Sequence, residues 1–317
     1  MTVSLGVHVG QQAMPMADLR ALWRRLDDAG VDWISVWDHL YEAPPLGGTV
    51  DHFEALSTLG ALAADTQRAR LGCLVFCVLY RNPGMLAKAA TTLDHISGGR
   101  FELGLGAGWH EPEAQAYGYD FPPVGRRLDQ LEEAIPLIRS LLTQERTTHT
   151  GEHFRTVDAS CLPAPVQARL PIWIGGTGEK RTLRIAAQHA DGWNAAYVGP
   201  DRYRALNARA DEWCAAEGRD PVTLRRSVNL IFALSTDGTD VAAVLEGQGW
   251  GAAAPFLADG ALGGSVDAAA ERVLQYVEAG AHEVNVALRA PWDEAALDAY
   301  LELLPQIRAA TATAAEG

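Results

Sequence analysis

The sequence predicts an α/β protein of the (β/α)8 TIM-barrel class. Short runs rich in Val, Ile and Leu alternate with longer segments of helical periodicity along the 317-residue chain. Strict alternation of this kind predicts a parallel sheet, and eight repeats of the unit favour a closed barrel over an open sheet. No change in composition separates two halves, so we expect a single domain over residues 1–317.

Helical faces and capping signals define the first half of the barrel. Leu19, Leu22 and Leu26 recur at helical spacing after the first strand. Asn82-Pro83 supplies an N-cap and a first-turn proline for the helix that follows the third strand. We expect strands at 3–9, 32–37, 70–80 and 100–105, with helices at about 16–29, 53–65, 83–96, 112–117 and 126–142.

The second half continues the alternation and carries two insertions. A small hairpin is expected around Gly151-Glu152, inside an insertion at about 144–162. A Gly/Ala-rich stretch at 247–265 has little periodicity and is expected to be the second insertion. We expect strands at 171–174, 191–197, 224–234 and 283–288, with helices ending at about 189, 216 and 279 and a last amphipathic helix around 297–304.

Composition and charge argue against several classes of protein. Hydrophobic residues make up 48% of the chain, which excludes general disorder. The formal net charge of −14 argues against a nucleic-acid partner. No apolar run approaches the roughly 20 residues that span a bilayer, and the N-terminus does not have the pattern of a secretion signal. We therefore expect a cytoplasmic protein that acts on a small molecule without a membrane partner.

The active site of such a barrel is expected at the C-terminal ends of its strands. His39 follows the second strand and is the best candidate for acid–base catalysis, because imidazole exchanges a proton near neutral pH. Asp38, or a backbone group, could fix its tautomer. His8 leaves the first strand, while Trp193 and Asn194 belong to the sixth, so these three residues are expected in a substrate pocket.

Two glycine-rich segments could hold a ligand. Gly104 to Trp109 has glycines at alternate positions, which either lets a planar ligand approach the backbone or serves tight strand packing. Its spacing is not that of a dinucleotide fold. Gly175 to Arg181 opens a helix and could bind an anion, with charge from Lys180 and Arg181, although an ordinary glycine turn is the alternative. No metal-ligand spacing and no hydrolase nucleophile motif is present, so no metal is expected.

These residues resemble the bacterial luciferase-like oxidoreductase family. The similarity runs from about Val3 to Arg308 and is carried by SVWDHL at 35–40, by the segment 68–123 and by LPIWIGGTGEKRTLRIAAQHADGWN at 170–194. The resemblance implies a TIM barrel, usually dimeric, so a homodimer is expected. Asp-His at the end of the second strand is similar to the actinobacterial branch that uses coenzyme F420, the 8-hydroxy-5-deazaflavin.

The resemblance also implies where the cofactor lies. It places a non-prolyl cis peptide at Leu74–Val75, in a bulge of the third strand that backs the ring, and the cofactor phosphate at the turn after the fifth strand. His39 matches the family's active-site histidine. Trp109 stands where the sugar-phosphate dehydrogenase of the family has a catalytic Glu, so glucose 6-phosphate is not the expected substrate. The implied cofactor-binding set is Leu74, Val75, Phe76, Gly106, Ala107, Gly108, Trp109, Gly175, Gly176, Thr177 and Gly178.

Three functions compete on this sequence. The first is an F420-dependent oxidoreductase that transfers a hydride between the deazaflavin and a small apolar substrate, with Trp109, Trp193 and Phe76 as an apolar wall. The second is an FMN-dependent monooxygenase, and the third is a non-catalytic flavin- or deazaflavin-binding protein. A groove lined by Lys88, Arg81 or Arg181 would favour the deazaflavin, because its tail is long and anionic.

Overall fold

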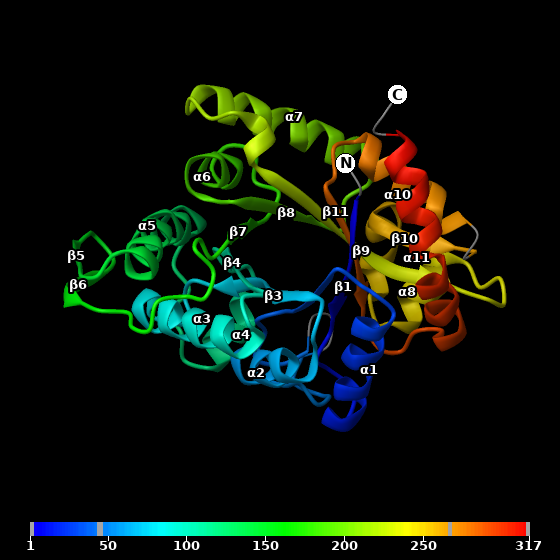
Figure 1. Ribbon diagram of the computed structural model, residues 1–317. Coiled ribbons are helices and arrows are strands. Elements are labelled where there is room, and N and C mark those ends of the chain that lie inside the picture. The colour runs from blue at the N-terminus through cyan, green and yellow to red at the C-terminus, as the bar shows by residue number, and fades with distance from the viewer. Residues whose placement is uncertain (1–2, 43–46, 266–267, 315–317) are drawn as a thin grey trace.

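A computed structural model of the chain shows a closed barrel of parallel strands surrounded by helices (Figure 1). It describes residues 3–42, 47–265 and 268–314. The barrel order is β1-β2-β3-β4-β7-β8-β9-β11, closed by pairing of β11 with β1. The barrel strands are β1 (Ser4–Val9), β2 (Trp33–Val36), β3 (Arg70–Cys77), β4 (Phe101–Gly106), β7 (Ile172–Gly175), β8 (Gly192–Ala196), β9 (Arg225–Leu234) and β11 (Glu283–Leu288). The prediction of an eight-stranded TIM barrel is confirmed.

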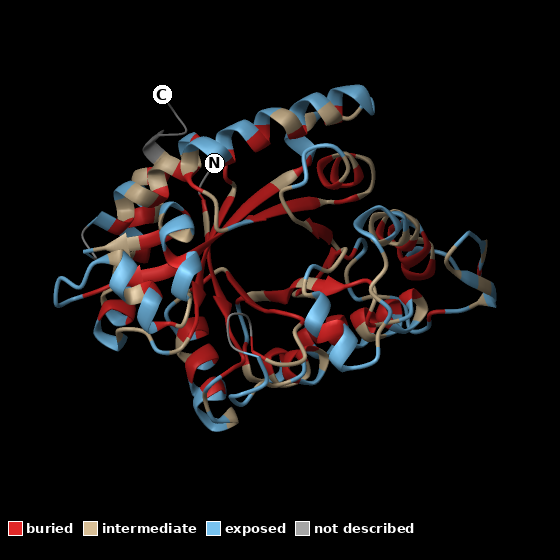
Figure 2. Cartoon of the chain, turned by 180° about the vertical axis from the view of Figure 1, so that it is seen from behind, coloured by how far each residue is buried: buried red, intermediate tan, exposed pale blue. Residues whose placement is uncertain are grey.

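Helices cover the outside of the barrel and bury one face each, as Figure 2 shows by the red inner and pale blue outer faces. The N-cap expected at Asn82 is confirmed, because its side chain accepts the N–H of Gly84. Gly98 ends the same helix at φ 65°. The helices are α1 (Met16–Asp28), α2 (Ala55–Asp65), α3 (Pro83–Ser97), α4 (Glu111–Ala116), α5 (Val124–Thr143), α6 (Thr182–His189), α7 (Pro200–Ala216), α8 (Val241–Gly247), α9 (Ala254–Leu257), α10 (Ala269–Glu278) and α11 (Glu294–Ala314).

Both expected insertions have structure of their own. The first is an antiparallel hairpin of β5 (Thr147–Thr150) and β6 (Arg155–Ala159). The second begins earlier than the sequence suggested, at α8, and continues through α9 to β10 (Ala261–Gly264), which pairs with the distal half of β9. A small apolar cluster, separate from the main core, holds this segment against β9. Its buried members are Ile231, Ala233, Leu245, Ala254 and Ala261.

The main core lies between the barrel and its helices, where the apolar faces of α1, α3, α5, α6 and α11 meet the outward side chains of the strands. Among the described residues, no helix is long and apolar enough to cross a membrane.

Candidate active site

A cavity of about 800 Å³ opens at the C-terminal ends of the barrel strands. Its size lies within the range of about 300–1,000 Å³ that is typical of small-molecule sites. Most of the expected site residues line it, and three of them, Phe76, Thr177 and Trp193, do not. The expected residues that line the cavity are His8, Asp38, His39, Leu74, Val75, Gly106, Ala107, Gly108, Trp109, Gly175, Gly176, Gly178 and Asn194.

His39 forms a hydrogen-bonded pair with a buried glutamate. Its Nδ1 lies 2.8 Å from Oε2 of Glu113, which α4 supplies. An ionised carboxylate can only accept, so Nδ1 carries the hydrogen and Nε2 is left to exchange a proton. His39 lines the cavity beside Trp109, whose ring meets the imidazole edge-on at 5.4 Å.

The surroundings of Glu113 favour its charged form. Burial alone would raise the pKa of this carboxyl, but hydrogen bonds from His39 and from the N–H groups of Leu40 and Tyr41 hold the pKa below its ordinary value. The Tyr80 hydroxyl donates a further bond, 3.1 Å to Oε2. The carboxylate therefore lies in a fixed position and holds the imidazole in one tautomer.

The expectation that Asp38 orients His39 is wrong. Oδ2 of Asp38 instead accepts from the N–H of Cys77 at 2.8 Å and from the Arg81 guanidinium at 2.7 Å. Arg81 also binds Glu54 at 2.8 Å, so the carboxylate is held from the side of β3 and α2. The other oxygen, Oδ1, has no hydrogen-bond partner within the described chain although Asp38 is buried and lines the cavity.

A bulge in β3 forms part of the cavity wall. The Leu74–Val75 peptide is cis, as the family resemblance implied, and the register with β4 shifts between Cys73 and Phe76. Leu74 and Val75 both turn into the barrel, where they meet Trp33 and Trp173.

The glycines of the neighbouring strands make room for this bulge. A Cβ on Gly106 would lie 2.5 Å from Val75 Cγ2, and one on Gly175 would lie 2.8 Å from Cγ1 of the same side chain. Tight packing against Val75 therefore explains these two glycines directly.

The bulge also explains why Phe76 is not in the cavity. Because two consecutive residues face inward, Phe76 turns outward into the main core, where it is fully buried beneath the Arg81 guanidinium. Its expected role as a wall of the site is wrong.

The prediction that Trp193 faces the cavity is wrong by one position in the strand. Asn194 faces the cavity, so its neighbour faces outward. The Trp193 ring stacks on Tyr203 of α7 with centroids 5.8 Å apart, and its Nε1 donates to the carbonyl of Gly176. It supports the glycine turn from behind and does not form a substrate wall.

The turn between β7 and α6 borders the cavity through Gly175, Gly176, Gly178 and Thr182. First-turn N–H groups of a helix have no partners within the helix and suit an anion. Thr177 is half-buried in this turn but does not line the cavity.

The basic residues expected at this turn, Lys180 and Arg181, do not line the cavity, and neither do Lys88 and Arg81, which were expected along the cofactor tail. Arg181 turns toward α5 and binds Asp129 and Glu132, and Lys88 donates to the carbonyl of Leu162. Of the three basic residues named for the cofactor tail, Arg81 borders a second hollow of about 760 Å³, together with Arg126.

His8 is buried in the cavity wall as a neutral side chain. Burial, with a smaller effect from His39, lowers its pKa to about 3. Its Nδ1 bonds to the Ser35 hydroxyl at 2.8 Å, and its ring meets the edge of Trp37. His8 is therefore uncharged at neutral pH and forms part of the cavity wall.

The cavity residues that sequence reasoning missed include Glu113, Tyr197, Asn229 and Trp250. Glu113 follows exposed Glu111 on a short helix, where acidic residues commonly occupy the first turn, so its burial had no signal of its own. Trp250 belongs to an insertion without periodicity. The inward position of Asn229 could have been inferred by counting alternate residues of β9.

The family model described as luciferase-like monooxygenase matches residues 1–248. An uncharacterized protein of Mycobacterium tuberculosis is 36% identical over 163 residues, which are 51% of this chain and 56% of that protein. An F420-dependent glucose-6-phosphate dehydrogenase of Nakamurella multipartita is 33% identical over 192 residues, 60% of this chain and 55% of the relative. The chain thus spans about half the length of these curated relatives.

Solved structures share the fold at low sequence identity. An F420-dependent secondary alcohol dehydrogenase in complex with an F420–acetone adduct superposes with a TM-score of 0.86 at 18% identity, over 97% of this chain and 99% of that chain. A type II Baeyer–Villiger monooxygenase of Pseudomonas putida in complex with FMN gives 0.73 at 17% identity, over 96% and 97%. With a family match over most of its length and the barrel that this match implies, the chain belongs to the luciferase-like monooxygenase family.

Proposed function

We propose that the protein is a coenzyme F420-dependent oxidoreductase that transfers a hydride between the deazaflavin and a small organic substrate. The observation that carries this proposal is the His39–Glu113 pair, which lies in one cavity with the β3 bulge and the β7–α6 glycine turn. The names of the curated relatives support F420 as the cofactor.

The residues present fit a deazaflavin. Oδ1 of Asp38 is a buried acceptor without a partner in the described chain, and it suits the ring N–H between two carbonyl groups of a pyrimidinedione. Leu74 and Val75 offer an apolar shelf to a flat ring. Gly176, Gly178 and Thr182 would hold the phosphate at the start of α6.

When bound, the deazaflavin supplies or accepts the hydride that no side chain can carry. His39 Nε2 takes up the hydroxyl proton of an alcohol as its carbon loses a hydride, and it returns a proton in the reverse direction. Glu113 keeps Nδ1 protonated throughout, so that the proton moves only at Nε2. Tyr80 holds Glu113 in place. Trp109, 63% exposed at the rim, shields the imidazole from part of the solvent.

A parallel titration of the purified protein with oxidised F420 and with FMN tests the proposal. We expect F420 to bind in the micromolar range or tighter and FMN to bind much more weakly. Asp38→Asn should weaken F420 binding, while Asp28→Asn, an exposed matched change, should not. A protein that prefers FMN and consumes oxygen would instead be a monooxygenase, and tight F420 binding without turnover of any alcohol, aldehyde or ketone would indicate a binding protein.

A further inference from the structure

Two buried asparagines on neighbouring strands line the cavity, and the mechanism above does not use them. Asn194 of β8 and Asn229 of β9 are 3% and 2% exposed, and both border the cavity. Nδ2 of Asn194 donates to Oδ1 of Asn229 at 3.1 Å. The side-chain amides of these two residues therefore form one hydrogen-bonded unit, the amide pair.

Further hydrogen bonds determine which atoms of the amide pair are already used. Nδ2 of Asn194 also donates to the Ser227 hydroxyl at 2.8 Å, so both of its hydrogens are bound. Oδ1 of Asn229 accepts a second bond, from Nδ2 of Asn285 at 3.2 Å. Turning the Asn229 amide over would bring its NH2 group against two other donors, so its orientation is fixed.

Asn285 is itself held from the lower part of the barrel. Its Nδ2 donates at 3.1 Å to Oε1 of Glu283, which is buried at the start of β11. Both hydrogens of this NH2 group are thereby bound, one to the carboxyl group and one to Asn229. This chain of bonds keeps the Asn229 oxygen turned toward Asn285 and its nitrogen turned away.

The network leaves one acceptor and one donor for a ligand. Oδ1 of Asn194 and Nδ2 of Asn229 take part in no hydrogen bond with another described residue. Oδ1 of Asn285 also lacks a partner but is sealed inside the barrel, whereas the two free atoms of the amide pair are open to the cavity. A buried polar atom that faces a cavity without a partner favours a ligand that supplies one.

We propose that the amide pair is a subsite for an amide or lactam group of the substrate. The substrate N–H donates to Oδ1 of Asn194, and the substrate carbonyl accepts from Nδ2 of Asn229. A ligand that has only one of these groups leaves an amide atom unpaired in a buried site, which is unfavourable. The inference rests on the proposed function, because a deazaflavin ring on the β3 bulge leaves β8 and β9 to the substrate.

The amide pair lies across the barrel from His39. In the closed order of strands, β8 is four strands from β2 in either direction, and β9 is its neighbour. Ala196 and Ile231 of β8 and β9 also line the cavity, and they would cover an apolar substrate body. The substrate class that follows is a compact lactam or carboxamide whose alcohol or carbonyl group faces His39. The hydride and the proton move at that group as described above, and the amide itself is unchanged.

Titration calorimetry with two probes of similar size tests the subsite. The first probe, 2-piperidone, has both the N–H and the carbonyl group, and the second, cyclohexanone, has the carbonyl group alone. Each is titrated into protein saturated with oxidised F420 and into the apoprotein. We expect 2-piperidone to bind about tenfold more tightly than cyclohexanone in both cases.

Variants of the amide pair separate the two contacts. Asn194→Leu should remove the preference for 2-piperidone, because the acceptor is lost. Asn229→Asp should weaken the binding of both probes about tenfold, because an ionised carboxylate cannot donate. Asn82→Asp is the matched control: Asn82 caps α3 outside the cavity, and aspartate caps a helix equally well, so both affinities should be unchanged.

Other results would overturn the subsite. Equal binding of the two probes by the unmodified protein would do so, as would a preference that survives in Asn194→Leu. A preference that is present in the apoprotein and abolished by F420 would place the cofactor ring on the amide pair and remove the substrate assignment. If Asn194→Leu does not fold, Asn229→Asp decides, since it keeps the shape of the side chain: unchanged binding of both probes would contradict the subsite.

Failure of this inference is distinguishable from failure of the proposed function. A preference for 2-piperidone that depends on Asn194, in a protein that does not bind F420, would refute the cofactor assignment alone. Tight F420 binding without a preference for 2-piperidone would refute the subsite alone.

Discussion

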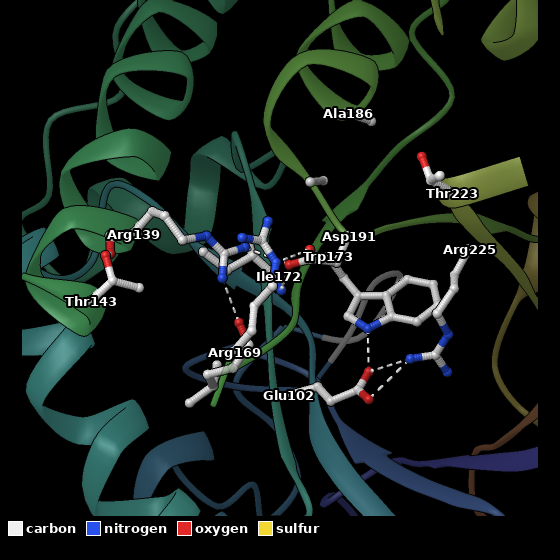
Figure 3. A network of polar contacts seen from close by, with 12 residues as sticks. Glu102, Arg139, Thr143, Arg169, Ile172, Trp173, Ala186, Asp191, Thr223 and Arg225 are labelled. Atoms are coloured by element: carbon white, nitrogen blue, oxygen red, sulfur yellow. Dashed lines mark hydrogen bonds and ion pairs between the residues drawn. The ribbon is translucent and has the colours of Figure 1, made fainter. Parts of the chain in front are cut away.

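The two ends of the barrel use buried carboxylates in opposite ways. At the floor of the barrel, where the strands begin, Glu102 of β4 accepts from Nε1 of Trp173 and forms an ion pair with Arg225 (Figure 3). Glu102 also forms an ion pair with Arg70. At the mouth, Glu113 and Asp38 are also buried and hydrogen-bonded. The difference is that the mouth leaves two polar atoms toward a cavity, Nε2 of His39 and Oδ1 of Asp38.

The floor illustrates what a purely structural ion network looks like. Beside Glu102, Asp191 binds Arg139, Arg169 and the N–H of Ile172, which ties α5 to the strands β7 and β8 (Figure 3). Residue type alone therefore does not identify a site. A site is identified by a polar atom that faces a cavity, such as Nε2 of His39. This agrees with the general location of active sites at the C-terminal face of such barrels.

The largest effect is expected at the mouth. Replacing His39 with Ala removes the group that exchanges the proton, so turnover should fall by about 10²–10⁴-fold while F420 affinity stays within a factor of about two. Steady-state kinetics and a cofactor titration check both parts. The surface pair His149–Glu133 provides a matched control, because its Nε2–Oε1 distance is 3.0 Å and it lies outside the cavity. His149→Ala should leave turnover unchanged, and an equal loss in both variants would remove the distinction between the pairs.

The second-largest effect is expected at the floor of the barrel, where a substitution should lower the stability of the fold. Glu102→Gln removes a buried anion that forms ion pairs with both Arg70 and Arg225, which should lower the free energy of unfolding by about 3 kcal/mol. This lies at the lower end of the usual range, since both arginines are partly exposed. Urea unfolding measures the loss, with Asp28→Asn as an exposed control. F420 affinity should remain unchanged in the folded variant, and a selective loss of affinity would connect the floor to the site.

Glu113→Gln should have a smaller effect on catalysis than loss of His39 itself. The amide keeps the shape but can donate as well as accept, so Nδ1 is no longer held protonated and turnover should fall by about 10–100-fold. A change confined to kcat, with F420 affinity retained, identifies Glu113 as a positioning residue. Glu111→Gln, on the exposed face of the same helix, is the control. If Glu113→Gln lowers F420 affinity and leaves kcat intact, the pair does not orient a catalytic imidazole.

The barrel could be predicted from the sequence because each strand and helix has a local sequence signal of its own. Asn82-Pro83 and Gly98 mark the ends of α3, and periodicity marks the faces that α1 and α5 bury. The position of His39 at the mouth could be predicted because this residue directly follows the second strand, at its C-terminal end.

The partners within the site could not be predicted in this way. Glu113 is 74 residues from His39 in the sequence, and no local pattern indicates which acidic residue of α4 faces inward. Phe76 and Trp193 show a related limit, since one bulge or one step of alternation moves a side chain from the cavity to the core. Trp250 depends on how an aperiodic insertion folds back over β9, which only tertiary packing decides.

The smallest expected effect is a difference between the two ends of the barrel in how folding stability depends on pH. Glu113 has a folded-state pKa below its ordinary value of 4.5, so its stabilising contribution is complete above that value and is lost as the pH falls through the folded pKa. Glu283, at the start of β11 in the floor, behaves oppositely: burial raises its pKa despite Arg225 and Asn285, so its protonated form is favoured and the contribution is lost as the pH rises through the folded pKa.

Unfolding free energies at about pH 7 and about pH 4 test this contrast in Glu113→Gln and Glu283→Gln, each compared with the unmodified protein. Acidification should shrink the stability advantage of the unmodified protein over Glu113→Gln and should increase its advantage over Glu283→Gln. Glu111→Gln should show little change, because that side chain is exposed. If acidification increased the advantage over Glu113→Gln as well, burial would dominate at the mouth as it does at the floor, and the hydrogen bonds around Glu113 would be too weak to keep it charged as the partner of His39. If acidification shrank both advantages, the raised pKa of Glu283 would be contradicted.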